Sequence, residues 1–178
     1  MSSEINKNTI VIAEAGVNHN GDESLAFDLI DAAVDSGADI VKFQTFKADS
    51  LVTKHAKKAE YQLENTAGSS SQIDMLRELE LEDHTYERLN AYCKEKDIEF
   101  LSTAFDLSSL HFLVSELELK RLKIPSGEIT NLPLILEYAK TELPIIISSG
   151  MSSLKEIKLA LGVLAFGYLK KTDKPNID

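Results

Sequence analysis

Two lysines lie inside apolar runs where a charged side chain is unexpected. Lys42 interrupts Ile-Val-Lys-Phe at 40–43, and Lys123 interrupts Leu-Lys-Ile-Pro at 122–125. Runs this apolar are typical of strands buried on both faces of a parallel sheet. A buried lysine needs a partner, because an isolated buried charge costs roughly several kcal/mol. Two such cations near strand ends, where ligands bind in folds of this kind, predict a site for an anion.

Polar side chains also stand at the ends of the other predicted strands. Besides the two lysines, these residues are Glu14, Gln44, Thr103, Ser126, Glu128 and Ser148. A ring of polar residues contributed by many strand ends is the pattern of active sites in (β/α)8 barrels. The alternative is structural: each lysine pairs with a carboxylate such as Glu14 or Glu128, and the hydroxyls of Thr103 and Ser148 cap the following loops.

The elements that must position these side chains alternate between strand and helix. Apolar runs predict strands at 9–13, 40–43, 100–102, 121–124 and 145–147. Helices are predicted between them, at about 75–79, 83–96 and 110–117, after a long polar stretch at 47–72. Asp22 and Asn131 are expected N-caps, Gly37 an expected helix end, and Ser153-x-x-Glu156 an expected capping box.

About five βα units without a hairpin signal predict an α/β fold with a parallel sheet. Two architectures fit, an open doubly wound sheet and a (β/α)8 TIM barrel. The motifs G-x-G-x-x-G and G-x-x-x-x-G-K-[ST] are both absent. The ring of polar strand ends therefore favours the barrel, of which about the first five βα units would be present, an incomplete barrel.

The composition limits which binding partners and which cellular compartment are expected. The chain has 178 residues, 43% of them hydrophobic and 27% charged, and a formal net charge of -10. An acidic chain is a poor match for nucleic acid or an anionic membrane. No apolar stretch reaches the roughly 20 residues of a membrane span, and no signal peptide is evident. The single cysteine, Cys93, excludes an internal disulfide and predicts a buried structural thiol in a cytoplasmic protein.

The four histidines give a weak signal. His19 lies in the turn Asn-His-Asn-Gly, where it could be a metal ligand or could order the mouth of a site. His55, His84 and His111 lack metal-ligand spacing and are predicted at the surface, as is the basic run 54–58. No metal ligand is assigned from the sequence.

Five segments together resemble the N-acetylneuraminate (sialic acid) synthase family, and within it the sialic and legionaminic acid synthase branch. They are IAEAGVNHNGD from Ile12, VKFQTFKAD from Val41, FLSTAFD from Phe100, KIPSGEITNLPLI from Lys123 and PIIISSGM from Pro144. The resemblance implies a phosphoenolpyruvate-binding TIM barrel followed by a small antifreeze-like domain. Residues 1–178 would be the N-terminal portion of the barrel, with the C-terminal domain absent, and the intact protein would be a homodimer.

The resemblance also implies a chemistry. Such enzymes condense phosphoenolpyruvate with an N-acyl-hexosamine such as N-acetylmannosamine, with C–O cleavage and release of phosphate. Lys42 and Lys123 would hold phosphoenolpyruvate, with hydroxyl donors from Thr103, Ser126 and Ser148, and Gln44 would orient substrate or a metal-bound water. Glu14 and Glu128 would be the catalytic acid and base, Glu14 nearer the intermediate and Glu128 nearer the sugar. A divalent metal, Mn²⁺ or Mg²⁺, would bind the intact enzyme through ligands beyond this chain.

One position departs from the pattern, and two alternatives stay open. Ala104 stands where an FLSTPFD segment has proline, which should loosen a turn there. The isolated chain is expected to be inactive, because the metal-binding histidines of the family would lie after Asp178. The alternatives are a Schiff-base aldolase, with Lys42 or Lys123 as the nucleophile, and a non-catalytic remnant that binds phosphoenolpyruvate. The identity of the acyl-sugar is left open.

Overall fold

The computed structural model describes residues 9–51 and 71–170, so the predicted basic run 54–58 and His55 lie outside the described residues. Its five strands are all parallel to their neighbours. One ladder joins β1 (Ile12–Gly16), β2 (Ile40–Thr45) and β3 (Glu99–Ala104), in that order. A second joins β4 (Leu122–Ile124) and β5 (Ile145–Ile147). The α/β class with parallel strands is confirmed.

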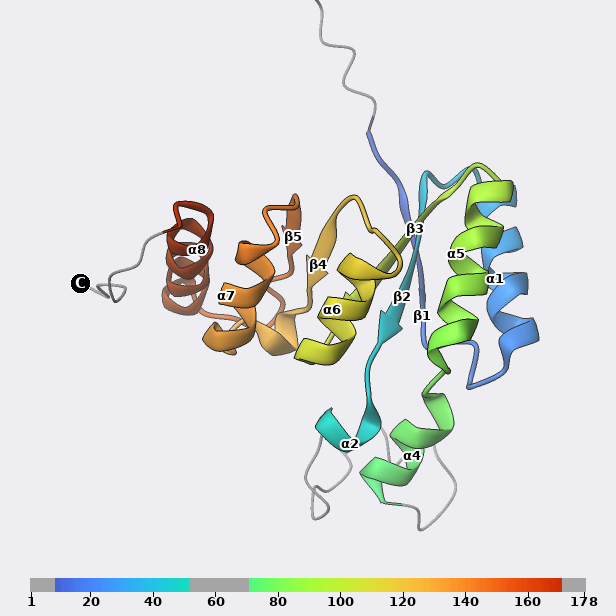
Figure 1. Cartoon of the computed structure of the whole chain (residues 1–178), viewed down its shortest axis with the longest axis horizontal. Coiled ribbons are helices and arrows are strands. Elements are labelled where there is room, and N and C mark those ends of the chain that lie inside the picture. Colours follow the sequence, from blue (N-terminus) through green and yellow to red (C-terminus); the bar gives the residue numbers. More distant parts are fainter. Residues whose placement is uncertain (1–8, 52–70, 171–178) are drawn as a thin grey trace, which may run out of the picture.

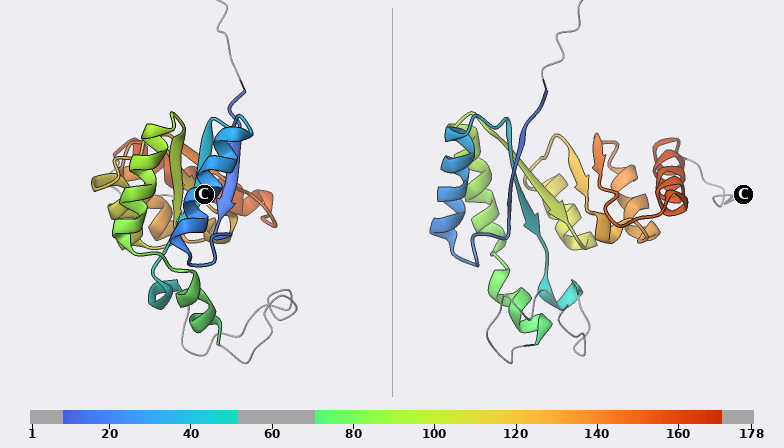
Figure 2. Two further views of the ribbon diagram at one scale, coloured as in Figure 1. Left: turned by 90° about the vertical axis from the view of Figure 1, so that its right-hand side faces the viewer. Right: turned by 180° about the vertical axis from the view of Figure 1, so that it is seen from behind.

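Helices follow the strands in chain order. They are α1 (Glu23–Asp35), α2 (Ala48–Leu51), α4 (Gln72–Leu79), α5 (Asp83–Glu95), α6 (Leu107–Ser115), the 3-10 turn η1 (Ser126–Glu128), α7 (Leu132–Lys140) and α8 (Leu154–Tyr168). Figure 1 shows α1 and α5 side by side along the first ladder, and α6, α7 and α8 continuing past β4 and β5. The views in Figure 2 place α2 and α4 together beyond the carboxyl end of β2. No described helix is long and apolar enough to cross a membrane.

Local signals explain where most helices begin. The Asp22 carboxylate accepts the backbone N–H groups of Ser24 and Leu25 and so caps α1, as predicted. The predicted cap of α7 at Asn131 and the capping box of α8 at Ser153 are also present. After α1, Gly37 has φ +73°, the left-handed conformation that ends helices.

The first strand was predicted at 9–13, but β1 begins at Ile12 and ends at Gly16. Its pairing starts where Ile12 meets Ile40 in β2. Before that point, Val11 donates its N–H to the Asp39 side chain and about half of its surface is exposed. The apolar run therefore begins before the sheet does, and the pairing partner sets the strand boundary.

Helix α6 was predicted at 110–117, but it begins at Leu107 and ends at Ser115. The reason is a cap that the apolar pattern does not show. The Asp106 carboxylate accepts the N–H and the hydroxyl of Ser109. Burial raises the pKa of Asp106, but the hydrogen bonds from Ser108 and Ser109 outweigh it and the pKa is lowered. The helix starts immediately after this residue.

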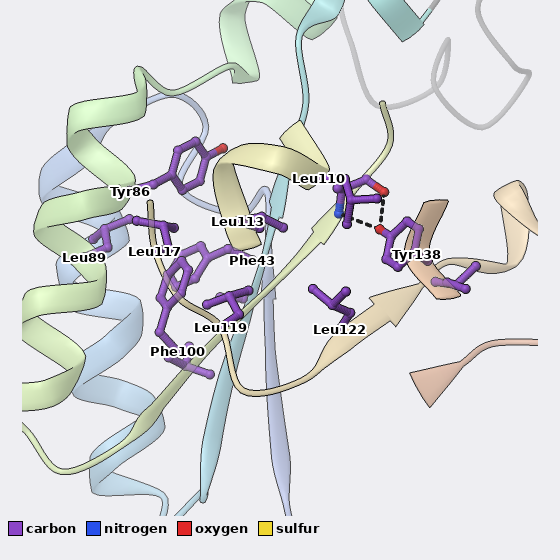
Figure 3. Packing of buried hydrophobic residues seen from close by; sticks show 14 of the residues in the cluster. Phe43, Tyr86, Leu89, Phe100, Leu110, Leu113, Leu117, Leu119, Leu122 and Tyr138 are labelled. Carbon is purple, nitrogen blue, oxygen red and sulfur yellow. Dashed lines mark hydrogen bonds between the residues drawn. The ribbon is translucent and has the colours of Figure 1, made fainter. Parts of the chain in front are cut away.

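One hydrophobic core lies between the strands and the helices and runs through both ladders. Val41 and Phe43 of β2 belong to it, as do Leu122 and Ile124 of β4. Figure 3 shows Phe43 and Phe100 near the helical residues Tyr86 and Leu89. Because side chains alternate along a strand, the neighbours of these core residues point to the other, inner face of the strands.

Side chains join the two ladders where the backbone does not. In the described residues, β3 and β4 belong to separate ladders. At the amino ends of these strands, Arg121 donates to both carboxylate oxygens of Glu99, at 2.7 and 3.1 Å. At the carboxyl ends, the Tyr138 hydroxyl of α7 bonds to the backbone of Ala104. We call this β3–β4 junction the seam.

Candidate anion site on the inner face of the strands

Lys42 and Glu14 form an ion pair on the inner face. They are register partners in β1 and β2, and Lys42 Nζ lies 2.7 Å from Glu14 Oε1. The Lys42 side chain is 7% exposed, whereas that of Glu14 is 59% exposed. The structural alternative, in which each lysine pairs with a carboxylate, thus holds for Lys42. Glu14, however, keeps more than half of its side chain exposed and open to a ligand.

Gln44 and Thr103 lie next to this ion pair. Gln44 is two residues beyond Lys42 and pairs in register with Thr103 of β3. A Cβ at Gly16 would stand 3.5 Å from Glu14 Oε1 and 3.6 Å from Gln44 Nε2, so both groups lie near the end of β1. The Thr103 hydroxyl is buried and has no partner within the described residues. An unpaired buried hydroxyl is a donor ready for a ligand.

Lys123 is the second cation, and its surroundings differ from those of Lys42. It lies between the core residues Leu122 and Ile124, so it points to the inner face. Among the residues that the structure describes, none forms a salt bridge with it. Burial lowers the pKa of Lys123, the charge of Lys42 lowers it further, and Glu14 opposes both effects. The charges of both Lys42 and Glu14 therefore act on Lys123 across the seam.

The other predicted residues follow β4 and β5. Ser126 begins η1, and its Oγ lies 3.5 Å from the point where a Cβ at Gly150 would stand. Ser148 follows β5 directly and donates its N–H to the Ile124 carbonyl. These two serines extend the site from the lysines toward the carboxyl ends of the second ladder.

Glu128, the second predicted carboxylate, lies at the end of η1. Its Oε2 accepts a hydrogen bond of 2.7 Å from the Asn131 side chain, which also caps α7. The structure thus orients Glu128 through the next helix, and this contact does not link it to the ion pair. No contact of the described residues joins the two predicted catalytic carboxylates, so their division of roles stays a prediction.

His19 is more buried than its turn sequence suggested. It is fully buried, packs near the Phe43 ring, and accepts the Gly21 N–H through Nδ1. Burial lowers its pKa. Because Nδ1 accepts the Gly21 N–H, a neutral imidazole here has its proton on Nε2. Gly21 has φ +77°, and a Cβ there would meet the Glu78 carbonyl of α4 at 2.1 Å. The loop between β1 and α1 thus packs closely against α4.

The NeuB family profile matches residues 29–177 of this chain. The chain belongs to the NeuB family. A relative in Campylobacter jejuni, N,N'-diacetyllegionaminic acid synthase, is 54% identical over 165 residues, which are 93% of this chain and 49% of the relative. The Legionella pneumophila protein of the same name is 55% identical over 151 residues, covering 85% of this chain and 42% of that protein. The family resemblance drawn from the five segments is confirmed.

A solved structure shows that the likeness extends to three dimensions. The sialic acid synthetase of Leptospira borgpetersenii, crystallised in complex with citrate, superposes with a TM-score of 0.76 at 29% identity. The match covers 90% of this chain and 52% of that protein. This member of the NeuB family therefore spans about half the length of the relatives it matches.

A complete metal site is not found in the described part of this NeuB chain. No group of three or more His, Cys, Asp or Glu side chains there could hold a metal ion. His84 and His111 are exposed, as predicted. Cys93 is buried, and burial raises the pKa of its thiol to about 12, in agreement with the predicted structural role.

Tyr138 was not singled out from the sequence. On the sequence it is one apolar position of the helix after Asn131, yet its hydroxyl bonds to two strands. The signal that could have found it is general, because a buried tyrosine hydroxyl almost always needs a hydrogen-bond partner. Ala104 also differs from expectation: it lies in β3, where Tyr138 binds both its N–H and its carbonyl, and not in a loosened turn.

Proposed function

We propose that this chain is the N-terminal portion of a TIM-barrel synthase that condenses phosphoenolpyruvate with an N-acyl-hexosamine. Five βα units with parallel strands and a length of about half that of the relatives support this reading. The barrel would be completed by further βα units outside these residues. The Campylobacter and Legionella relatives favour a legionaminic-type acceptor sugar over other N-acyl-hexosamines.

The observation that carries the proposal is the imbalance of charge on the inner face. Lys42 and Lys123 both point there, but the described residues supply an ion pair for Lys42 and none for Lys123. A half-buried cation beside a second cation favours a bound anion. Phosphoenolpyruvate carries a phosphate and a carboxylate a few ångströms apart, which suits two ammonium groups and nearby hydroxyls. The citrate complex of the Leptospira relative fits a site for a multiply charged anion.

The residues have distinct tasks in the proposed reaction. Lys42 and Lys123 bind the anion, with the hydroxyls of Thr103, Ser126 and Ser148 as donors, and Gln44 orients it. Carbon 3 of the enol attacks the sugar aldehyde, which leaves positive charge at carbon 2. Water then adds to carbon 2, and cleavage of the C–O bond releases phosphate. Glu14, open to the site, stabilises the positive charge and accepts a proton from water, while Glu128 donates a proton to the aldehyde oxygen as it becomes a hydroxyl.

Several predictions for the intact protein go with this proposal. A Mn²⁺ or Mg²⁺ ion would polarise the sugar aldehyde, but the described residues do not supply its ligands and we derive no step through it. An antifreeze-like domain, a homodimer and a cytoplasmic location also remain predictions. The isolated 178-residue chain is expected to bind phosphoenolpyruvate without turning it over.

The test is release of phosphate from phosphoenolpyruvate in the presence of Mn²⁺, with and without N-acetylmannosamine or the diacetylated legionaminic precursor sugar. It is run on this chain and on a hybrid in which the remaining part of the Campylobacter synthase follows residue 178. We expect sugar-dependent release by the hybrid, abolished by Lys42→Met and retained by Lys140→Met, a charge-matched change on the outer side of α7. Sugar-independent release, or full activity of the Lys42→Met hybrid, contradicts the proposal.

One observation favours the Schiff-base alternative enough to test it. The lowered pKa of Lys123 increases the fraction of neutral amine, which is the form that attacks a carbonyl. Incubation with pyruvate and borohydride, followed by mass spectrometry, would then show a stable adduct on Lys123. The synthase proposal expects no adduct at Lys123, because its reaction passes through no imine.

A further inference from the structure

The seam between β3 and β4 divides the candidate site. Thr103 and the Glu14–Lys42 pair belong to the first ladder, and Lys123 to the second. Backbone ladders fix the spacing within each group. In the residues that the structure describes, no ladder hydrogen bond fixes the spacing between the groups. Something else must hold Thr103 and Lys123 at a constant separation if one ligand is to contact both.

The Tyr138 hydroxyl is the group that lies at this end of the seam. It donates to the Ala104 carbonyl at 2.7 Å and accepts the Ala104 N–H at 3.1 Å. The carbonyl of Lys123 lies 3.3 Å from the same oxygen. The tyrosine is 1% exposed and Ala104 is fully buried, so water does not compete for these bonds. Figure 3 shows the two bonds to Ala104 as dashed lines from the Tyr138 ring.

The contacts of Tyr138 reach the site through the backbone. Ala104 directly follows Thr103, whose buried hydroxyl is unpaired among the described residues. Lys123 is contacted at its own carbonyl. The Tyr138 hydroxyl oxygen thus contacts the backbone of Ala104, next to Thr103, and the backbone of Lys123. The other junction, Arg121 with Glu99, lies at the opposite ends of these strands, away from the site.

We propose that Tyr138 is a positioning residue that sets the separation of Thr103 and Lys123 across the seam and thereby the affinity for phosphoenolpyruvate. This inference rests on the proposed function, because it takes both residues to contact the same anion. Tyr138 does not touch the ligand. It acts through the two strands, whose carboxyl ends it holds together from the outer, helical side.

The experiment measures the dissociation constant of phosphoenolpyruvate by calorimetry, at a temperature where circular dichroism shows every variant folded. The variants of the 178-residue chain are Tyr138→Phe and, as the matched control, Tyr92→Phe. The control loses a tyrosine hydroxyl that bonds to Asp31 between α5 and α1, far from the seam. Displacing a binding group by a fraction of an ångström to 1 Å costs about tenfold to a hundredfold. We expect about tenfold weaker binding by Tyr138→Phe and a change of less than about twofold in the control.

A double-mutant cycle separates positioning from a general loss of stability. If Tyr138 acts through Lys123, the effect of Tyr138→Phe should fall to less than about threefold in a Lys123→Met background. An equal loss in both backgrounds, or unchanged binding by Tyr138→Phe, overturns the positioning role while leaving the proposed function in place. Absence of phosphoenolpyruvate binding by the unaltered chain overturns the proposed site and the positioning role together.

Should Tyr138→Phe fail to fold, amide hydrogen exchange of the unaltered chain answers the same question. The Ala104 N–H is exchangeable only when its bond to Tyr138 opens. If the closed seam is the binding-competent form, saturating phosphoenolpyruvate should slow exchange at Ala104 by about tenfold or more. Equal exchange rates with and without the ligand overturn the positioning role.

Discussion

The two ladders of this chain position their parts of the site by different means. Strands β1 to β3 have five or six residues each, and β3 is almost entirely buried. Strands β4 and β5 have three residues each, and all three residues of β5 are partly exposed. In the first ladder, backbone register places Glu14 beside Lys42 and Gln44 beside Thr103. In the second, backbone register pairs Lys123 with Ile146, and hydrogen bonds across the seam come from the side chains of Arg121 and Tyr138. Lys42, which has an ion-pair partner, therefore lies in the longer three-stranded ladder, and Lys123, which has none among the described residues, lies in the short two-stranded ladder.

The largest expected effect is on the free energy of unfolding, and it compares the packing of α5 beside the first ladder with that of α8 beyond the second. Leu89 of α5 is fully buried in the core, whereas Leu161 of α8 is 48% exposed. We expect Leu89→Ala to lower the free energy of unfolding by about 2–5 kcal/mol and Leu161→Ala to change it by about 0.5 kcal/mol or less. Urea denaturation followed by circular dichroism measures both. Equal losses would show that the second region is packed as tightly as the first.

A smaller effect is expected at the amino end of the seam. Arg121 and Glu99 form a bidentate pair, and their side chains are 29% and 22% exposed. Arg121→Gln should lower the free energy of unfolding by about 1–3 kcal/mol, because it leaves a partly buried carboxylate without its partner. The matched control is Arg88→Gln, which breaks a more exposed pair with Glu23 and should cost about 0.2–1 kcal/mol. If Arg88→Gln lowers the free energy of unfolding as much as Arg121→Gln does, the Arg121–Glu99 pair contributes no more to stability than an ordinary surface pair.

The smallest effect concerns pH and His19, in the loop between β1 and α1. Burial places the pKa of His19 in the folded chain below its ordinary value of 6.5. Between these two pKa values the unfolded chain binds a proton that the folded chain does not, so stability falls as the pH drops below about 6.5. The slope from this group is at most about 1.4 kcal/mol per pH unit.

Urea midpoints measured between pH 7.5 and pH 5 test this expectation. His19→Asn, whose side-chain oxygen can still accept the Gly21 N–H, should flatten the decline. His84→Gln on the exposed side of α5 should keep the profile of the unaltered chain. If the stability of His19→Asn falls with pH as much as that of the unaltered chain, the decline comes from other titrating groups.

Much of the fold, and the position of the candidate residues at strand ends, could be predicted from the sequence, because both depend on local signals. The βα alternation, the caps at Asp22 and Asn131, and the inward direction of Lys42 follow from apolar patterns, capping chemistry and strand alternation. The start of β1 and of α6 could not be predicted from the apolar runs, since pairing with Ile40 and capping by Asp106 decide them.

The seam was also beyond sequence reasoning. Whether β3 and β4 share a ladder depends on how the sheet is divided in space, and no local pattern reports it. Tyr138 is buried in α7, and its contacts with Ala104 and Lys123 join residues far apart in the sequence, so no local pattern indicates them. The same holds for the pKa of Lys123, which depends on its burial and on its neighbours Lys42 and Glu14.

The central claim is that Lys123, which has no ion-pair partner among the described residues, binds an anion together with Lys42. The most direct test is the dissociation constant of phosphoenolpyruvate for the unaltered chain, for Lys123→Met and for the charge-matched control Lys140→Met. Loss of a charged contact to phosphate or carboxylate costs about 1.5–3 kcal/mol, so we predict binding about tenfold to a hundredfold weaker for Lys123→Met and unchanged for Lys140→Met. Equal affinity of Lys123→Met and the unaltered chain would contradict the account.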